Sequence, residues 1–224
     1  MQPKHIILVR HGQSAGNVNK LLYKDTPDYT LRLTPTGREQ ALTAGKELAT
    51  MLGDTTVQFY VSPFWRTRDT YRLIAKSFPK SGFYEDPRLR EQEWGHYREP
   101  ERTDAIETER EQYGHFYYRF PDGESCADVF DRVSDFFNTL HRDFKKPTFP
   151  ETAIIVSHGM TIRLILMRWL HLSVEVFEEL ANPRNCEYIV LKYVPETDKY
   201  VLATPLRKHE VKHEYQYDWN DNLS

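Results

Sequence analysis

The sequence predicts a single three-layer α/β domain in which helices cover both faces of a mostly parallel β-sheet. Three observations support this prediction. Short runs rich in β-branched residues recur along the chain, helical patterns lie between them, and no repeat or Pro-rich linker divides the 224 residues. Strands that alternate with helices are typical of parallel sheets. We expect this domain to span residues 1–204, followed by a polar C-terminal tail at 205–224.

The expected strands are short and mostly apolar. They are Ile6–Val9, Val57–Val61, Ala153–Val156, Tyr188–Tyr193 and Tyr200–Ala203. A helix is expected between the first two, because small and apolar residues from Ala41 to Leu52 recur at helical spacing. Thr34 is its predicted N-cap, and Pro35 stands at the first helical position, where its missing N–H does no harm.

A second amphipathic helix is expected from Val129 to Phe144, with Ser125 as its N-cap and Asp128 completing a capping box. Between this helix and the earlier strands, residues 96–120 read as an insertion that lies over the sheet. Its first part is acidic and its second part is aromatic. Two interpretations remain open for it: a helix that packs its rings onto the domain, or a lid over a site.

Composition excludes several functional classes. The formal net charge is −3, which provides no electrostatic footprint for nucleic acid or an anionic membrane. The two cysteines, Cys126 and Cys186, make no disulfide framework and suggest a reducing compartment. The apolar run at the N-terminus, Ile6–Val9, is too short for a signal peptide or a membrane span. We therefore expect a soluble, cytoplasmic, globular protein.

Two strands end in the same dipeptide. The runs that end at His11-Gly12 and at His158-Gly159 are each a buried type of strand followed by a helical segment. In open α/β sheets, residues just beyond the carboxyl ends of strands line the ligand crevice. The two histidines are therefore expected to face each other across one site, although one such histidine alone would be an ordinary loop residue.

Arginines and the N-termini of predicted helices lie next to these histidines or at the end of another predicted strand. Arg10 precedes His11, and Arg66 follows another predicted strand. Arginine presents a planar fork that fits phosphate oxygens, and a helix that begins near Ser14 would point N–H groups at an anion. Asn17 could donate a further hydrogen bond. This combination indicates a site for a phosphoryl group.

The motif Leu8-Val-Arg-His-Gly-Gln-Ser-Ala-Gly-Asn17 resembles the signature of the histidine phosphatase superfamily, also called the phosphoglycerate mutase-like family. Further segments resemble family blocks in the same order. They are Leu33–Ala41, Ser62–Thr70, Leu89–Gly95, Pro121–Ser125 and Val156–Gly159. Within the family, Asn182-Pro-Arg-Asn185 looks similar to small plant and fungal broad-range phosphatases. The resemblance implies the phosphoglycerate mutase-like fold.

It also implies roles for single residues. His11 matches the nucleophile that becomes phosphohistidine, and Glu91 matches the proton donor, with Glu93 as a rival two residues away. His158 belongs to the catalytic set and to the phosphate pocket. The other expected phosphate contacts are Arg10, Asn17, Arg66 and Gly159. The implied reaction is hydrolysis of small phosphomonoesters to inorganic phosphate, without a metal or an organic cofactor.

The expected substrate is a small phosphorylated metabolite. Acidic and aromatic residues are expected to line the site, with Trp94, Tyr97 and Tyr117 as candidate lid residues. Such a lining favours a small or partly apolar monoester over a polyphosphate as the substrate. The same aromatic residues could instead form the contact of a homodimer.

Several alternatives remain. Gly12-Gln-Ser14-Ala-Gly16 has the form of a serine hydrolase elbow, and Cys126 with Arg132 has the spacing of a cysteine phosphatase loop, but lacks its glycines. Nine histidines suggest a metal site, yet no metal-binding motif spacing occurs. Within the family, the rival is a cofactor-dependent phosphoglycerate mutase, whose middle region is longer and more basic. A non-catalytic phospho-ligand-binding module is the last alternative.

Overall fold

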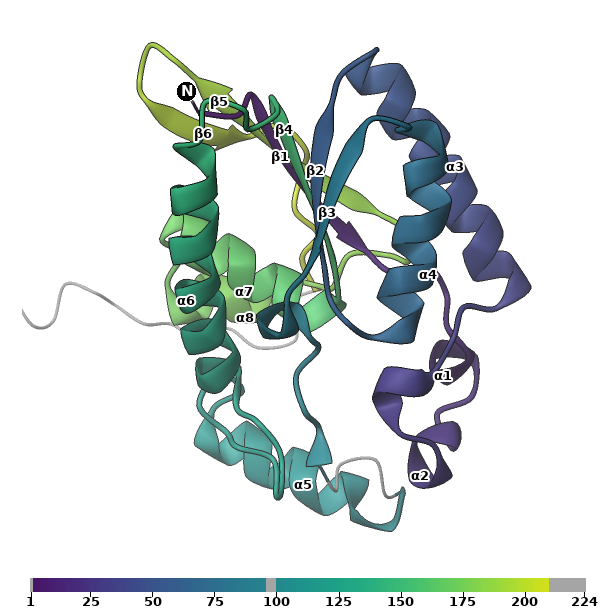
Figure 1. Cartoon of the computed structure of the whole chain (residues 1–224). Coiled ribbons are helices and arrows are strands. Elements are labelled where there is room, and N and C mark those ends of the chain that lie inside the picture. The colour runs from purple at the N-terminus through teal and green to yellow at the C-terminus, as the bar shows by residue number, and fades with distance from the viewer. Residues whose placement is uncertain (1, 96–99, 210–224) are drawn as a thin grey trace, which may run out of the picture.

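The computed structural model describes residues 2–95 and 100–209 and shows one six-stranded sheet between two helical layers (Figure 1). The strands are β1 (His5–Arg10), β2 (Val57–Val61), β3 (Ser81–Glu85), β4 (Thr152–Ser157), β5 (Tyr188–Val194) and β6 (Lys199–Leu202). Their order is β3-β2-β4-β1-β5-β6. The first four are parallel, whereas β5 runs antiparallel to β1 and β6 antiparallel to β5. The predicted α/β fold with a mostly parallel sheet is confirmed.

Alternate side chains of the central strands enter two different cores. In β1, Ile6 and Leu8 join the core on one face of the sheet, whereas Ile7 and Val9 join the core on the other face. All four side chains are at most 1% exposed. Strands that are buried on both faces read as continuous apolar runs, which explains why the sequence patterns were visible. The five predicted strands are present, with each end displaced by at most one residue.

Four helices make up the two layers. They are α3 (Pro35–Leu52) and α4 (Trp65–Ile74) on one face, and α6 (Cys126–Phe144) and α7 (Gly159–Leu170) on the other. The predicted caps are confirmed: the Thr34 side chain accepts from the Gly37 N–H, and Ser125 forms a capping box with Asp128. Within the described ranges, none of the helices is long and apolar enough to cross a membrane.

Strand β3 was not predicted. Its sequence is Ser-Gly-Phe-Tyr-Glu, and residues 82–85 are exposed, so that it lacks the apolar pattern of the central strands. As an edge strand it pairs only with β2. The remaining described elements are α5 and several shorter ones. These are the helices α1 (Ala15–Val18), α2 (Leu22–Asp25) and α8 (Val174–Glu179), and the 3-10 turns at 28–30, 75–77 and 87–89.

The described part of the insertion forms helix α5 (Pro100–Tyr113) and an irregular return. Ile106, Tyr118 and Phe120 make a small core of their own, against which Trp94 packs. Phe116 instead enters the main core. Figure 1 shows that α5 lies beyond the end of the sheet at which β1, β2 and β4 finish, opposite α1 and α2. Rings do pack onto the domain, and the helix also lies at the edge where a site is expected.

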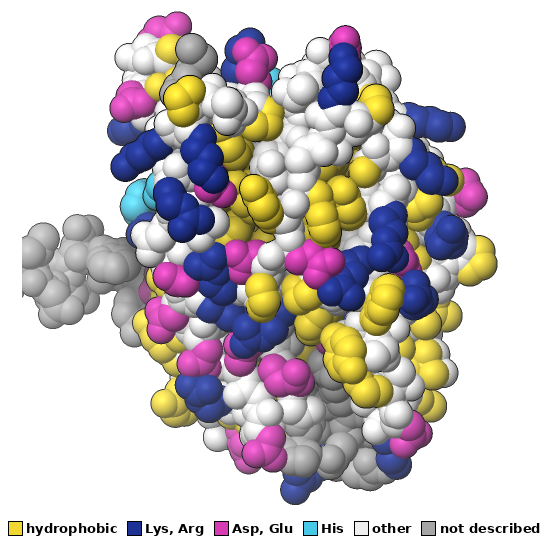
Figure 2. Space-filling model, in the orientation of Figure 1, with side chains coloured by type: hydrophobic (Ala, Val, Ile, Leu, Met, Phe, Trp, Pro, Cys, Tyr) yellow, Lys and Arg dark blue, Asp and Glu magenta, His cyan; other side chains and the backbone are white. Residues whose placement is uncertain are grey.

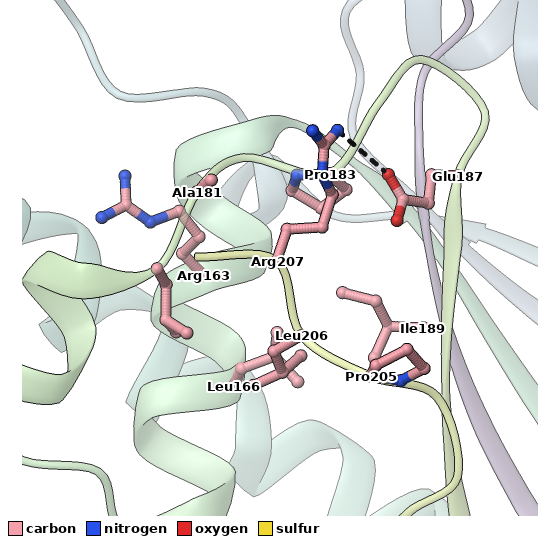
Figure 3. A pocket seen from close by; sticks show the side chains of 10 residues that line it. Arg163, Leu166, Ala181, Pro183, Glu187, Ile189, Pro205, Leu206 and Arg207 are labelled. Carbon is pink, nitrogen blue, oxygen red and sulfur yellow. Dashed lines mark ion pairs between the residues drawn. The ribbon is translucent and has the colours of Figure 1, made fainter. Parts of the chain in front are cut away.

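The start of the expected C-terminal tail lies against the domain. The Ala181 N–H donates to the Arg207 carbonyl at 2.8 Å, and the His209 N–H donates to the Glu179 carbonyl at 2.8 Å. Figure 3 shows the small cavity beneath this segment, with Leu166 and Leu206 among its lining residues. Its volume of about 10 Å³ suffices for about one water molecule, which excludes it as a substrate site. Residues 210–224 lie outside the described part.

Backbone contact between α3 and Gln13, in the segment that follows β1, leaves no room for a side chain at Gly37. A Cβ there would lie 2.0 Å from the Gln13 carbonyl oxygen. Because backbone atoms cannot rotate away, we expect Gly37→Ala to lower the free energy of unfolding by about 1–3 kcal/mol. Urea unfolding measures this. The exposed Glu39→Ala on the same helix is the control, and equal stability of the two variants would contradict the prediction.

Candidate active site

Two histidines lie side by side where the central strands end. Arg10 closes β1 and pairs with Ser157, which closes β4, so the residues that follow leave the sheet at the same edge. These residues are His11 and His158. Their ring centroids are 5.2 Å apart and their planes are inclined by 62°. The side chains are 3% and 0% exposed. The structure thus brings the two strand-end histidines together in one buried pair.

The His11 ring is held in one tautomer. Its Nδ1 lies 2.7 Å from the Gly12 carbonyl oxygen, which can only accept a hydrogen bond, so Nδ1 carries the proton. Burial, followed by the charges of Arg66 and Arg10, lowers the pKa of His11 well below its usual value. The ring is therefore neutral at neutral pH, and its Nε2 keeps a lone pair that can attack an electrophile.

His158 is also buried and neutral. Its Nε2 lies 2.7 Å from the Ser62 hydroxyl, which follows β2, and its buried Nδ1 has no hydrogen-bond partner among the described residues. Burial, followed by the charge of Arg66, lowers the pKa of His158 well below its usual value. Gly159 opens α7 directly after it. Ser62 was not predicted as a partner, although it stands at the end of a predicted strand.

Arg66 is oriented by a residue that the sequence analysis did not single out. Its Nη1 donates to the Asp28 carboxylate at 2.7 Å and to the Asp28 carbonyl at 2.8 Å, and its Nη2 donates to the other carboxylate oxygen at 3.2 Å. The two side chains are 3% and 7% exposed. Such a two-point contact fixes the plane of the guanidinium. In the sequence, Asp28 is an acidic residue in a turn, and no spacing marks it.

Arg10 contacts the chain on the other side of the site. Its Nη1 donates to the Pro183 carbonyl at 2.6 Å. Its buried Nε has no hydrogen-bond partner within the described ranges. This N–H is a donor suited to an anionic oxygen beside His11. Arg10 and Arg66 thus supply positive charge at the histidine pair, as the sequence analysis expected of a phosphate pocket.

Asn17 serves the local fold in this structure. Its side-chain oxygen accepts from the Ser14 N–H at 3.0 Å, which completes the capping box of α1. The same oxygen accepts from the Asn185 amide at 3.1 Å, and that amide also donates to the His11 carbonyl at 3.1 Å. Asn17 is therefore linked to the main chain of His11 through Asn185. Its role as a phosphate contact stays a prediction.

The two candidate acids lie in different surroundings. The Glu91 carboxylate accepts from the Thr161 N–H at 3.3 Å, from the Thr161 hydroxyl at 3.2 Å and from the Met160 N–H at 3.4 Å. These donors belong to the first turn of α7, beside His158. Glu93 is exposed, and its carboxylate accepts from the Gly95 N–H at 3.4 Å. Of the two, Glu91 is thus the acid whose carboxylate contacts the helix that begins directly after His158, and its role as proton donor stays a prediction.

The candidate lid residues fall in three different situations. Trp94 packs edge-to-face on Phe120 with ring centroids 5.1 Å apart. Tyr117 is 58% exposed and contacts the Phe116 ring edge-to-face. Tyr97 lies outside the described residues. The lid role of these residues stays a prediction.

The residues of the rival motifs have structural roles in this fold. Ser14 is buried and caps α1, while the His158 Nε2 contacts Ser62 instead, so the serine hydrolase pair is not formed. Cys126 is 1% exposed in the core, and burial raises the pKa of its thiol to about 11. It opens the helix that also carries Arg132, so no phosphate loop lies between them. Within residues 2–95 and 100–209, no group of three or more potential ligands is arranged to hold a metal ion.

The buried histidines make stability depend on pH. Below about pH 6.5 the unfolded chain takes up protons at His11 and His158, whereas the folded chain does not. We therefore expect the free energy of unfolding to fall between about pH 7 and pH 5.5, by up to ~1.4 kcal/mol per pH unit for each histidine. Urea unfolding in phosphate-free buffer measures this. The variant His11→Asn/His158→Asn should show a weaker pH dependence, and an unchanged slope would contradict the prediction.

Known proteins match this chain over most of its length. The chain is 45% identical over 205 residues to the phosphoglycerate mutase-like protein AT74 of Arabidopsis thaliana, which covers 85% of this chain and 65% of that protein. The chain thus spans just under two thirds of the length of this relative. It is 27% identical over 304 residues to the broad-range acid phosphatase DET1 of Saccharomyces cerevisiae, over 92% and 90% of the two chains.

The fold has solved counterparts. A mycobacterial glucosyl-3-phosphoglycerate phosphatase superposes with a TM-score of 0.73 at 21% identity, over 92% of this chain and 100% of that one. At this identity the likeness shows the fold alone. The family model of the histidine phosphatase superfamily (branch 1) matches residues 6–204. With the paired histidines at the ends of β1 and β4, the chain belongs to the histidine phosphatase superfamily, branch 1.

Proposed function

We propose that this protein is a metal-independent phosphatase that hydrolyses small phosphomonoesters through a phosphohistidine at His11. One observation carries the proposal. The Nδ1–H of His11 donates a hydrogen bond to the Gly12 carbonyl, and the lowered pKa of His11 keeps the ring neutral. The lone pair on Nε2 is therefore available as a nucleophile. The name of the yeast relative, a broad-range acid phosphatase, supports the same activity.

In the first step, the lone pair of His11 Nε2 forms a bond to phosphorus while the bond from phosphorus to the ester oxygen breaks. The ester oxygen takes a proton from the Glu91 carboxyl and leaves as an alcohol. Arg10, Arg66 and His158 surround the non-bridging oxygens, whose charge the two guanidinium groups stabilise. The Gly12 carbonyl stabilises the positive charge that the imidazole ring acquires.

In the second step, water replaces the alcohol. The Glu91 carboxylate takes a proton from water, whose oxygen forms a bond to phosphorus while the bond from phosphorus to Nε2 breaks. The products are inorganic phosphate, neutral His11 and a protonated Glu91. No metal or organic cofactor enters either step. The aromatic residues of the 94–120 region favour small or partly apolar monoesters as substrates.

The proposal is tested by the covalent intermediate and by product analysis. With EDTA present, p-nitrophenyl phosphate should release inorganic phosphate, and an alkaline quench followed by mass spectrometry should find one phosphoryl group on the peptide that contains His11. Interconversion of 3-phosphoglycerate and 2-phosphoglycerate that is much faster than phosphate release would favour the mutase. Phosphate binding without turnover of any ester would favour a binding module, and either result would overturn the proposal.

A further inference from the structure

The main chain of the loop that carries Glu91 accepts hydrogen bonds from two neighbouring helices. Thr161 of α7 donates its hydroxyl to the Arg90 carbonyl at 2.8 Å, and Arg132 of α6 makes the other contacts. Arg132, in the second turn of α6, donates from Nη1 to the Arg88 carbonyl at 2.5 Å and to the Arg90 carbonyl at 2.9 Å. Its Nη2 donates to the carbonyl of Glu91 itself at 3.1 Å. Residues 90–94 belong to no helix or strand, so their main chain depends on such contacts for its position.

Glu124 holds this arginine and the loop at the same time. Its carboxylate accepts from Arg132 Nε and Nη2, both at 3.1 Å. It also accepts from Arg90 Nη2 at 2.5 Å and from the Glu93 N–H at 3.0 Å, on either side of Glu91 in the chain. The side chains of Arg132 and Glu124 are only 11% and 14% exposed, so solvent weakens the pair little.

A third contact ties the loop to the same segment. Gln92 is 1% exposed, its side-chain amide donates to the Glu124 carbonyl at 2.8 Å, and its own N–H donates to the Glu91 carboxylate at 3.1 Å. The Glu91 carboxylate thus lies between two anchored parts of the protein. One is the first turn of α7, which donates to it, and the other is the Arg132–Glu124 pair, which holds its backbone.

We infer that Arg132, oriented by Glu124, positions Glu91 so that its carboxyl group reaches the ester oxygen; this rests on the proposed function, in which Glu91 carries the proton. Arg132 is a positioning residue and not a catalytic one, because its hydrogen bonds go to main-chain carbonyls and to Glu124. A displacement of about 1 Å in a reacting group can lower a rate by about 10²-fold.

The neighbouring Arg88 provides a matched control. It also links this stretch of chain to α6, because its Nη1 donates to Asp135 at 2.6 Å and its Nη2 to Thr139 at 2.7 Å. Its side chain makes none of the hydrogen bonds found here to the main chain of residues 90–93. Figure 2 shows that Lys and Arg side chains are interspersed with Asp and Glu across the middle of the face that it draws. Each of the two variants, Arg132→Gln and Arg88→Gln, removes one positive charge, so the loss of charge alone is common to both.

The distinguishing measurement is sensitivity to the leaving group. p-Nitrophenolate is a stable anion that leaves without a proton, whereas the alkoxide of an alkyl phosphate requires one. Arg132→Gln should therefore lower kcat/KM for an alkyl phosphate by about 10²-fold and for p-nitrophenyl phosphate by less than about 10-fold. Arg88→Gln should change both by the same small factor. Glu124→Gln, which keeps the shape of the side chain, should shift the ratio in the same direction as Arg132→Gln.

Glu91→Gln is the reference. It should show the same selective loss, and adding Arg132→Gln to it should lower the rate little further, because the proton donor is already absent. An equal loss on both substrates with Arg132→Gln, while Glu91→Gln discriminates between them, would overturn the positioning role alone. If Glu91→Gln itself does not discriminate, both the positioning role and the proposed role of Glu91 fail. Unfolding curves of each variant identify any general loss of structure.

Discussion

Replacing His11 with alanine is expected to abolish phosphate release from every ester tested, with kcat/KM reduced by at least about 10⁴-fold. The physical reason is that no neighbouring group can take over the attack. His158 is 5.2 Å away between ring centroids, and its Nε2 contacts the Ser62 hydroxyl. The measurement is phosphate release from p-nitrophenyl phosphate with EDTA present.

The control for this variant is His141→Gln, because His141 is an exposed histidine on the outer side of α6. It should turn over at the rate of the unchanged protein. His11→Ala removes a buried ring and so lowers stability, but it leaves no unpaired charge buried, so we expect the variant to fold. Urea unfolding checks this. Equal turnover by the His11→Ala variant and the unchanged protein would show that His11 is not the nucleophile.

The second large effect is expected at Arg66. Arg66→Met should lower kcat/KM by about 10²–10³-fold, because a charged donor aimed at the transferring phosphoryl group is lost. It should also lower the free energy of unfolding by about 3–5 kcal/mol, since the buried Asp28 carboxylate loses its two-point contact with the Arg66 guanidinium. Phosphate release and urea unfolding measure the two effects separately.

A double variant separates stability from activity. In Arg66→Met/Asp28→Asn the buried carboxylate charge is removed together with the guanidinium charge, so much of the lost stability should return while the activity remains low. Arg32→Met is the control, because Arg32 is 55% exposed where it meets Asp69 and its loss should change the free energy of unfolding by at most about 1 kcal/mol. Recovery of activity in the double variant would contradict the role of Arg66 in catalysis.

The parts that could be predicted from the sequence are those whose signal is local. The strands that lead to His11 and His158 are apolar runs followed directly by polar residues, and the caps Thr34 and Ser125 act on residues three positions away. Because the carboxyl ends of parallel strands meet at one edge, local signals sufficed to predict that the two histidines meet.

The parts that could not be predicted depend on contacts between distant segments. Asp28 is linked to Arg66 through the packing of a 3-10 turn against α4, and Arg132 reaches a loop more than forty positions earlier in the chain. Asp28 stands in no sequence pattern, and the one pattern that includes Arg132, its spacing from Cys126, indicates a different chemistry. Strand β3 was missed because its residues 82–85 are exposed and an edge strand requires no apolar alternation.

The strand order determines when, during synthesis of the chain, the two histidines can come together. Strand β4 lies between β1 and β2, although it follows both of them in the chain. A ribosome-bound nascent chain that has released β1 and β2 but not β4 therefore lacks the strand that joins them and cannot place His158 beside His11. Closing such distant pairings is entropically slow, so the protein should bring His11 and His158 together in the last cooperative stage of folding and not gradually.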